Sequence, residues 1–305
     1  MAQTDAKTTV PAATARGVEA TPLPQPVRQW ELVELAAAGA LTEVYRARPA
    51  GASPERPASY ALKTLRPQCQ DDPRAVAILR REAWVGRTVS HPHVISLLAA
   101  AVAEPPYYVV MPWLSGNSLA VHLAGGKGLD PAVAFWIARQ VAEGLGALRE
   151  AGWIHGDVKP SNIFVAPEGH VTLLDLGFAR RIADRGSPDQ RCVAGTCNYI
   201  APERIAPGHP IDVPSDIYSL GVVLFEMLSG RLPFEGQDAA EVARKHREAR
   251  VPELARLVPG LPAEACTLVR AMLAKEPLRR PQDPQEPIDR LARLEIATFA
   301  RRQAG

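Results

Sequence analysis

The chain has 305 residues, of which 47% are hydrophobic and 22% are charged, which is the composition of a globular protein with one large domain or two lobes. Its formal net charge is only +2, so charge gives no case for a nucleic-acid partner. The four cysteines have no Cys-x-x-Cys spacing, which favours a reducing compartment over a disulfide framework or a zinc site. No apolar run is long enough to span a bilayer, and the N-terminus lacks the hydrophobic core of a signal peptide. We therefore expect a soluble, cytoplasmic protein.

The N-terminal segment is unlike the rest of the chain. Residues 1–28 are rich in Ala, Thr and Pro and show no apolar periodicity, so we expect them to form a disordered leader. From Trp30 onwards apolar residues follow a strand-like pattern. A second strand-like run, 60–63, ends at Lys63. Taken alone, a lysine at the end of a strand is most often an ordinary exposed side chain.

A helix is predicted after the second strand. Asp72 and Pro73 mark its start, because Asp accepts a backbone hydrogen bond at the N-cap and Pro fits the first helical turn. Apolar residues then recur at helical spacing, and Glu82 falls on this helix. The His-Pro-His segment 91–93 breaks the pattern. Two histidines so close suggest a metal pair, but no Cys, Asp or Glu neighbour completes one, so we interpret the segment as a turn.

The remaining predicted elements alternate between short strands and longer helices. An Asp-Pro start signal at Asp130 precedes one of the helices. The expected strands are 94–103, 107–111 and 171–174, and the expected helices are 119–123, 132–150, 217–228 and 286–303.

The most informative stretch is the loop 154–165, Ile-His-Gly-Asp-Val-Lys-Pro-Ser-Asn-Ile-Phe-Val. Asp157 can accept a hydroxyl proton, Lys159 can neutralise a moving phosphate, and Asn162 can hold a metal ion. This set of groups suits phosphoryl transfer. By itself, however, a His-Gly-Asp turn after a strand could equally be an ordinary loop.

Further motifs follow that loop in a fixed order. An Asp-Leu-Gly turn lies at 175–177, Gly-Thr and Ala-Pro-Glu elements lie within 195–203, Asp216 opens an apolar helix, and Arg280 precedes a proline. In order and spacing, these motifs and the loop 154–165 resemble the catalytic domain of a bacterial-type (Hanks-type) serine/threonine protein kinase. A lysine two residues after the loop aspartate, followed by proline, favours the serine/threonine class over the tyrosine class.

The resemblance covers residues 29–303 and implies an α+β fold with two lobes. The N-lobe, 29–111, is then an antiparallel sheet with one helix. The hinge is 112–114, and the C-lobe, 115–303, is mainly helical. ATP would lie between the lobes, together with Mg²⁺ or, as an alternative, Mn²⁺.

The resemblance also implies catalytic roles. Asp157 aligns the substrate hydroxyl and accepts its proton, and Lys159 stabilises charge on the phosphoryl group. Asn162 and Asp175 hold the metal ion. The residues implied to contact or position ATP are Gly39, Val44, Ala61, Lys63, Glu82, Met111, Trp113, Leu114 and Phe164. Within that set, Lys63 is oriented by Glu82, and adenine is expected to use the backbone of Trp113 and Leu114.

Three residues are implied to be structural. Glu203 is expected to form an ion pair with Arg280 that takes no part in the chemistry. Asp216 is expected to brace the catalytic loop from the helix that it opens.

Several positions depart from the family pattern. Of the three glycines expected over the ATP phosphates only Gly39 remains, because Ala37 and Thr42 occupy the other two positions; this predicts weaker or reshaped nucleotide binding. Gly86 replaces a large apolar residue, which costs about 1 kcal/mol of helix propensity and predicts a hole beside the Asp-Leu-Gly segment. Pro112 is unusual in a hinge.

A fourth departure concerns regulation. Gly156 stands where most protein kinases carry Arg, so the charge that an activation-loop phosphate usually neutralises is missing. Ser187 is the only Ser or Thr between residues 177 and 195, and Thr196 is expected to contact the catalytic Asp and Lys. We hypothesise that phosphorylation in this loop is not required for activity.

Two alternatives come from other classes of protein. A pseudokinase, acting as a nucleotide-binding or scaffolding module, is favoured by the lost glycines, Gly86 and Pro112, but opposed by the intact Lys, Glu, Asp, Asn and Asp set. A small-molecule kinase is suggested by the His-Gly-Asp form of the loop, but such enzymes lack the Gly-Thr and Ala-Pro-Glu segment. We expect a protein substrate, with no nucleic acid and no membrane span; a regulatory partner or a dimer is left open.

Overall fold

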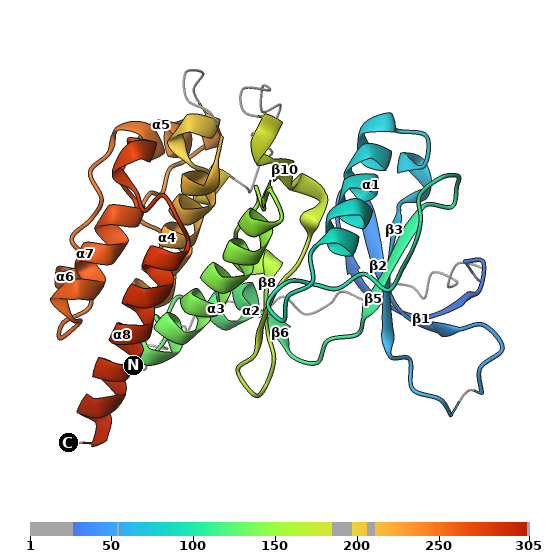
Figure 1. Ribbon diagram of the computed structural model, residues 1–305, viewed down its shortest axis with the longest axis horizontal. Coiled ribbons are helices and arrows are strands. Elements are labelled where there is room, and N and C mark those ends of the chain that lie inside the picture. Colours follow the sequence, from blue (N-terminus) through green and yellow to red (C-terminus); the bar gives the residue numbers. More distant parts are fainter. Residues whose placement is uncertain (1–26, 54, 185–196, 206–210, 304–305) are drawn as a thin grey trace, which may run out of the picture.

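The N-terminal lobe is built on an antiparallel sheet of five strands, in the order β1-β2-β3-β5-β4. The computed structural model describes residues 27–53, 55–184, 197–205 and 211–303. The five strands are β1 (Trp30–Ala38), β2 (Thr42–Pro49), β3 (Tyr60–Leu65), β4 (Ala99–Ala101) and β5 (Tyr108–Pro112). Helix α1 (Pro73–Thr88) lies beside this sheet, as Figure 1 shows.

The two faces of this sheet bury different apolar clusters, because successive side chains of a strand point to opposite faces. Leu62 and Val110 belong to the cluster on one face. Val109 belongs to the other cluster, which also contains Leu79 of α1. Lys63 is the direct cross-strand partner of Val109, so it projects on the α1 side of the sheet. The alternation of β3 thereby directs Lys63 towards the helix that carries the predicted acidic partner.

The C-terminal lobe is mainly helical. Its helices are α2 (Leu119–Leu123), α3 (Pro131–Glu150), α4 (Val213–Ser229), α5 (Ala239–Glu248), α6 (Leu254–Leu257), α7 (Ala263–Met272) and α8 (Gln285–Gln303). Helix α3 packs against both α4 and α8. Helix α4 is buried on almost every side, which fits its apolar sequence and its place at the centre of the lobe. The expected two-lobed α+β architecture is confirmed.

Two small sheets position the predicted catalytic segments. Strands β6 (Asn117–Ser118), β8 (Ile163–Val165) and β9 (Val171–Leu173) form one sheet, and β7 (Trp153–Ile154) pairs with β10 (Arg180–Arg181). The loop of Asp157 therefore runs from β7 to β8, and Asp175 comes just after β9. Short ladders on both sides hold these two segments close to each other.

The two helix starts predicted from Asp-Pro signals are confirmed. The Asp72 side chain accepts a hydrogen bond from the Arg74 amide at 2.9 Å, and α1 begins at Pro73. In the same way the Asp130 side chain accepts from the Ala132 amide at 2.9 Å at the start of α3. Each cap satisfies an amide that the helix itself leaves without a partner.

The predicted strand over 94–103 is wrong in its first half, since β4 contains only Ala99–Ala101. Val94 and Ile95 are instead buried in the core of the C-terminal lobe. The Ile95 amide donates to the carbonyl of Leu173 on β9 at 2.9 Å. The apolar residues at 94 and 95 thus anchor the chain in one lobe before it enters the sheet of the other.

Most of the predicted leader, 1–28, falls outside the described residues. Its last two residues are described: Val27 forms a bridge with Trp30, and Arg28 forms an ion pair with Glu104 at 3.4 Å. Among the residues that the structure describes, no helix is both long and apolar enough to cross a membrane.

The cysteines depart from the expectation drawn from their spacing. Cys69 and Cys266 are free thiols, but Cys197 is disulfide-bonded. The scattered positions of the cysteines in the sequence did not predict this bond, because disulfide partners are set by the path of the chain.

Candidate active site

Lys63 lies at the centre of a buried cluster of charges. Its Nζ is 3.0 Å and 2.8 Å from the two carboxylate oxygens of Glu82, and 3.0 Å from Oδ1 of Asp175. These residues come from β3, α1 and the turn after β9. Lys63 and Glu82 are only 8% and 1% exposed, so their charges interact with little screening by water.

Each of these three pKa values reflects burial and the charge of the neighbours. Burial opposes the charged form of Lys63, but the Asp175 and Glu82 carboxylates outweigh burial and raise the lysine pKa above its usual range. Burial raises the pKa of Glu82 to about 7, against the lowering effect of Lys63. Burial also acts to raise the pKa of Asp175, but Lys63 reverses the effect and the pKa is lowered. At neutral pH, Lys63 is therefore an ammonium ion and Asp175 a carboxylate.

The catalytic loop brings its three polar side chains together. Oδ2 of Asp157 lies 2.7 Å from the Lys159 Nζ and 2.9 Å from the Asn162 amide nitrogen. Asn162 also donates to the backbone carbonyl of Asp157 at 2.8 Å. Asp157 is only 5% exposed, and these contacts orient its carboxylate. The structure thus places the predicted base beside a fixed positive charge.

The backbone under Asp157 is held from α4. The Asp216 carboxylate accepts hydrogen bonds from the amides of His155, at 2.6 Å, and Gly156, at 2.9 Å. Burial raises the pKa of Asp216, and the electrostatic effect of the nearby His155 ring and the hydrogen bonds from these two amides oppose the rise. Asp216 is thereby placed where the sequence expects a brace for the catalytic loop.

Asn162 and Asp175 are the residues whose chemistry suits a bound Mg²⁺. In the described part of the chain, no group of three or more His, Cys, Asp or Glu side chains is arranged to bind a metal ion. This donor set fits a magnesium ion shared with a nucleotide, because Mg²⁺ is often held by one or two protein oxygens together with substrate phosphates. The ionised Asp175 supplies the charged oxygen, and the Asn162 side chain supplies a neutral one.

The predicted nucleotide-contacting residues gather around Lys63 on the sheet. Val44 of β2 is its cross-strand partner, and Ala61 of β3 pairs with Met111 of β5. Phe164 lies on β8, directly after the catalytic loop. Strands of the N-terminal lobe and a strand of the C-terminal lobe therefore supply the predicted lining of the cleft.

The retained glycine of the β1–β2 hairpin is not required by packing. The Gly39 amide donates to the Thr42 carbonyl at 2.8 Å, which closes the turn. A Cβ at Gly39 would lie 3.6 Å from that carbonyl oxygen, an ordinary contact. The case for glycine here thus rests on the approach of a phosphate and not on the fold itself.

The hinge differs from expectation at Trp113. The Trp113 amide donates to the Ser59 carbonyl at 2.9 Å, so this N–H is already used inside the sheet. The Trp113 ring lies under the Arg46 guanidinium, 5.1 Å from the ring centroid. The backbone contact expected between adenine and Leu114 stays a prediction.

The hole predicted at Gly86 is absent, because Leu97 fills it. A Cβ built on Gly86 would lie 2.6 Å from Cγ of Leu97. Gly86 is buried, and the glycine lets this part of α1 approach the Leu97 side chain closely. The prediction of a gap considered only the sequence of the helix and missed the residue that packs onto it.

The predicted structural ion pair forms, whereas the predicted residues of the activation segment are not described. Glu203 and Arg280 form a two-pronged ion pair with N–O distances of 2.7 and 2.8 Å. Ser187 and Thr196 lie outside the described residues.

Two residues that hold the backbone of the catalytic loop were not predicted from the sequence. The His155 ring holds the Asp157 amide through Nδ1 at 3.2 Å and the Leu174 carbonyl through Nε2 at 3.0 Å. Arg204 donates to the Gly156 carbonyl. The only hint of Arg204 is its position directly after the Ala-Pro-Glu element.

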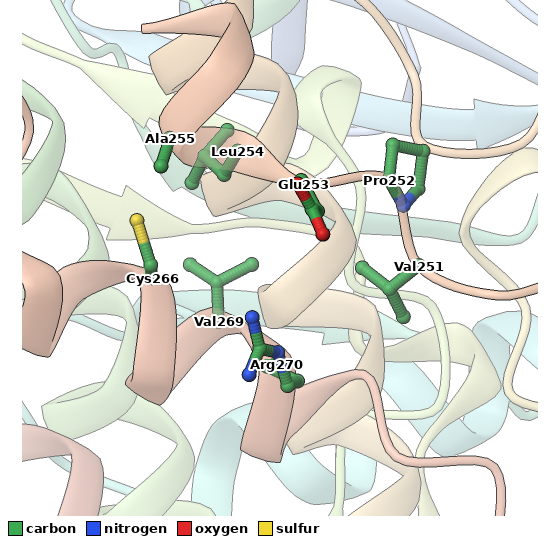
Figure 2. Close-up of a pocket in the computed structure, with 8 residues that line it drawn as sticks. All are labelled: Val251, Pro252, Glu253, Leu254, Ala255, Cys266, Val269 and Arg270. Carbon is green, nitrogen blue, oxygen red and sulfur yellow. The ribbon is translucent and has the colours of Figure 1, made fainter. Parts of the chain in front are cut away.

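A separate hollow of about 280 Å³ lies in the C-terminal lobe, between α7 and the segment that leads into α6. Figure 2 shows Cys266, Val269 and Arg270 of α7 on one side of it. The residues facing them are Val251, Pro252, Glu253, Leu254 and Ala255. None of the predicted catalytic or nucleotide-binding residues lines this hollow, so we assign it no part in the chemistry.

Comparison with known families identifies the class of protein. The model of the protein kinase domain matches residues 31–288, which is most of the chain. The chain belongs to the protein kinase family, and the resemblance drawn from its motifs is confirmed.

Relatives with a similar sequence include bacterial serine/threonine kinases. The chain is 35% identical to serine/threonine-protein kinase PknB of Mycobacterium tuberculosis, over 85% of this chain and 41% of that protein. It is 29% identical to serine/threonine-protein kinase PrkC of Bacillus subtilis, over 83% of this chain and 38% of that protein. The chain thus spans less than half the length of these relatives.

Proposed function

We propose that this chain transfers the γ-phosphate of ATP to serine or threonine hydroxyls of proteins, including its own. The observation that carries the proposal is the buried Lys63, held between Glu82 and Asp175 at 2.8–3.0 Å, next to a catalytic loop whose Asp157 contacts Lys159. A scaffolding protein of this fold would have no need to keep all of these groups in place. None of the five residues Lys63, Glu82, Asp157, Asn162 and Asp175 has been lost, which argues against a pseudokinase.

Each residue then has a defined task. Lys63 holds the α- and β-phosphates, and Glu82 keeps the ammonium group in place. Asp157 accepts a hydrogen bond from the substrate hydroxyl and takes its proton as the oxygen attacks, while Lys159 stabilises the negative charge on the phosphoryl group. Asn162 and Asp175 would hold Mg²⁺, which would supply positive charge to the phosphates when bound. Positioning and electrostatics therefore account for the rate, with no covalent step on the protein.

The proposal extends to the metal ion and to the substrate. We propose Mg²⁺ as the ion in use, with Mn²⁺ able to replace it, because both accept oxygen ligands. The substrate is a protein, and the expectation of a regulatory partner or a dimer stays a prediction.

Transfer of radiolabelled phosphate from ATP tests the proposal. A basic protein serves as acceptor, and wild type is compared with Asp157→Asn and Asp175→Ala. Wild type should label Ser or Thr. Asp157→Asn should lose about 100-fold or more, because general-base catalysis contributes about 10²–10⁴-fold. Asp175→Ala should lose transfer as well, because the metal ion would lose its charged protein oxygen. The exposed Asp71 offers a matched control, since Asp71→Asn is the same chemical change away from the cleft. Transfer that survives in both site variants, or is absent from wild type with Mg²⁺ and ATP, would contradict the proposal.

A further inference from the structure

We propose that Arg204, which directly follows the Ala-Pro-Glu element, is a positioning residue. It fixes the peptide plane between Gly156 and Asp157. The inference rests on the proposed kinase function. Arg204 ends a 3₁₀ turn, Pro202–Arg204, and its guanidinium donates to the Gly156 carbonyl, 48 residues earlier in the chain. The side chain is half-buried, so this contact is partly shielded from water.

Position 156 itself cannot carry an arginine without strain. Gly156 has a φ of 77°, in the left-handed region that side chains disfavour. A Cβ there would lie 2.5 Å from the Phe178 carbonyl oxygen. Two independent features of the backbone therefore favour glycine at position 156, and in this chain the guanidinium that contacts the loop comes from another segment.

The peptide plane between residues 156 and 157 is held on both sides. Its carbonyl accepts from Arg204, and its N–H donates to Nδ1 of His155 at 3.2 Å. Asp216 holds the two preceding amides at 2.6 and 2.9 Å. All four contacts act on the three residues that end at Asp157.

Removal of Arg204 breaks only one of these contacts, but that contact restrains the backbone angles of Gly156. Gly156 can adopt backbone angles that other residues cannot, so the carbonyl can rotate once the guanidinium is gone. Such a rotation would move the Asp157 carboxylate relative to the substrate hydroxyl. Misplacement of a catalytic group by about 1 Å can lower the rate about 100-fold.

The nucleotide site should be insulated from this change. Lys63 forms ion pairs with both Glu82 and Asp175, and the contacts described for these three residues do not involve Arg204. A positioning role therefore predicts a fall in kcat with little change in the KM for ATP. Loss of the fold would instead lower the amount of active protein and the unfolding temperature together.

The test compares Arg204→Met, which keeps the apolar stem but removes the donors, with Arg204→Lys, which keeps a charged donor. We expect Arg204→Met to lower kcat about 10–100-fold while the KM for ATP stays within about threefold, and Arg204→Lys to regain most of the loss. Arg256→Met is the matched control, because Arg256 is exposed and its ion pair among the described residues is with Glu253, three residues earlier. If Arg204→Met does not fold, Arg204→Gln takes its place.

Amide hydrogen exchange gives a readout that does not depend on catalysis. The amides of residues 155–157 should exchange faster in Arg204→Met than in wild type, while those of β3 stay unchanged. The inference is overturned if kcat stays within about twofold of wild type, if KM and kcat change in proportion, or if exchange at residues 155–157 is unaltered. If wild type transfers no phosphate, the proposed function fails, and the exchange experiment still decides whether Arg204 fixes the loop.

Discussion

Replacement of Arg280 by methionine should destabilise the C-terminal lobe strongly. Every N–H of the Arg280 side chain has a partner: two go to Glu203, and the others go to the carbonyls of Ala274, Pro214 and Lys275, all at 2.7–3.0 Å. Arginine has five such donors, so the set is complete. Arg280 is 3% exposed and Glu203 is 6% exposed. Among the described residues, methionine would leave the buried Glu203 carboxylate with the Ser215 hydroxyl as its one remaining side-chain partner.

The size of the effect follows from this burial. Removal of one partner of a buried ion pair costs about 3–5 kcal/mol, because the remaining charge loses its compensation. For a domain of this size each kcal/mol lowers the unfolding temperature by roughly 2–4 °C, so we expect a fall of roughly 6–20 °C.

Thermal unfolding followed by circular dichroism measures this change. The neighbouring Arg279 is the matched control: its side chain is 73% exposed, so its ion pair with Glu276 is worth at most about 1 kcal/mol. The double variant Glu203→Gln with Arg280→Met should recover part of the loss, because no buried charge remains. The reasoning is refuted if Arg280→Met unfolds within about 2 °C of Arg279→Met.

Three further predictions concern other parts of the chain. Burial lowers the pKa of His246 from 6.5 to about 4, so the neutral ring contributes its full stabilisation above pH 6.5. This contribution, about 3 kcal/mol in total, is lost as the pH falls towards 4. His246→Asn should flatten the pH dependence of the unfolding free energy measured in denaturant titrations. Gly86→Leu should lower the free energy of unfolding by about 1–3 kcal/mol and also lower kinase activity, because the new side chain would collide with Leu97 and displace α1. Gly125→Ala is the control: its Cβ would meet no atom within 4 Å, so both quantities should stay unchanged in the same assays. Ser187→Ala should retain transfer activity in the radiolabel assay, because the catalytic loop has glycine in place of the usual arginine; loss of activity with an intact fold would contradict the hypothesis that loop phosphorylation is dispensable.

Local signals in the sequence were sufficient for much of the architecture. The starts of α1 and α3 follow from Asp-Pro pairs, because capping involves residues only two positions apart. The catalytic loop is also local, since Asp157 and Asn162 are five residues apart and contact each other. The order of such short motifs along the chain was enough to predict the family and the two-lobed fold.

The contacts between distant segments were decided only by the tertiary structure. Lys63 meets Asp175 across 112 residues of sequence, and no pattern in either segment indicates that distance. The side chain of Leu97 fills the space beside Gly86 that the helix sequence alone left empty.

The catalytic loop shows most clearly which features the sequence determines and which the tertiary structure determines. The residue types at Asp157 and Lys159 follow from the sequence, and they define the chemistry. The groups that hold the backbone beneath them, Asp216 and Arg204, come from later segments of the chain. A sequence specifies which groups are available, but their mutual orientation depends on how the packed lobe brings its segments together, because hydrogen bonds act only over about 3 Å.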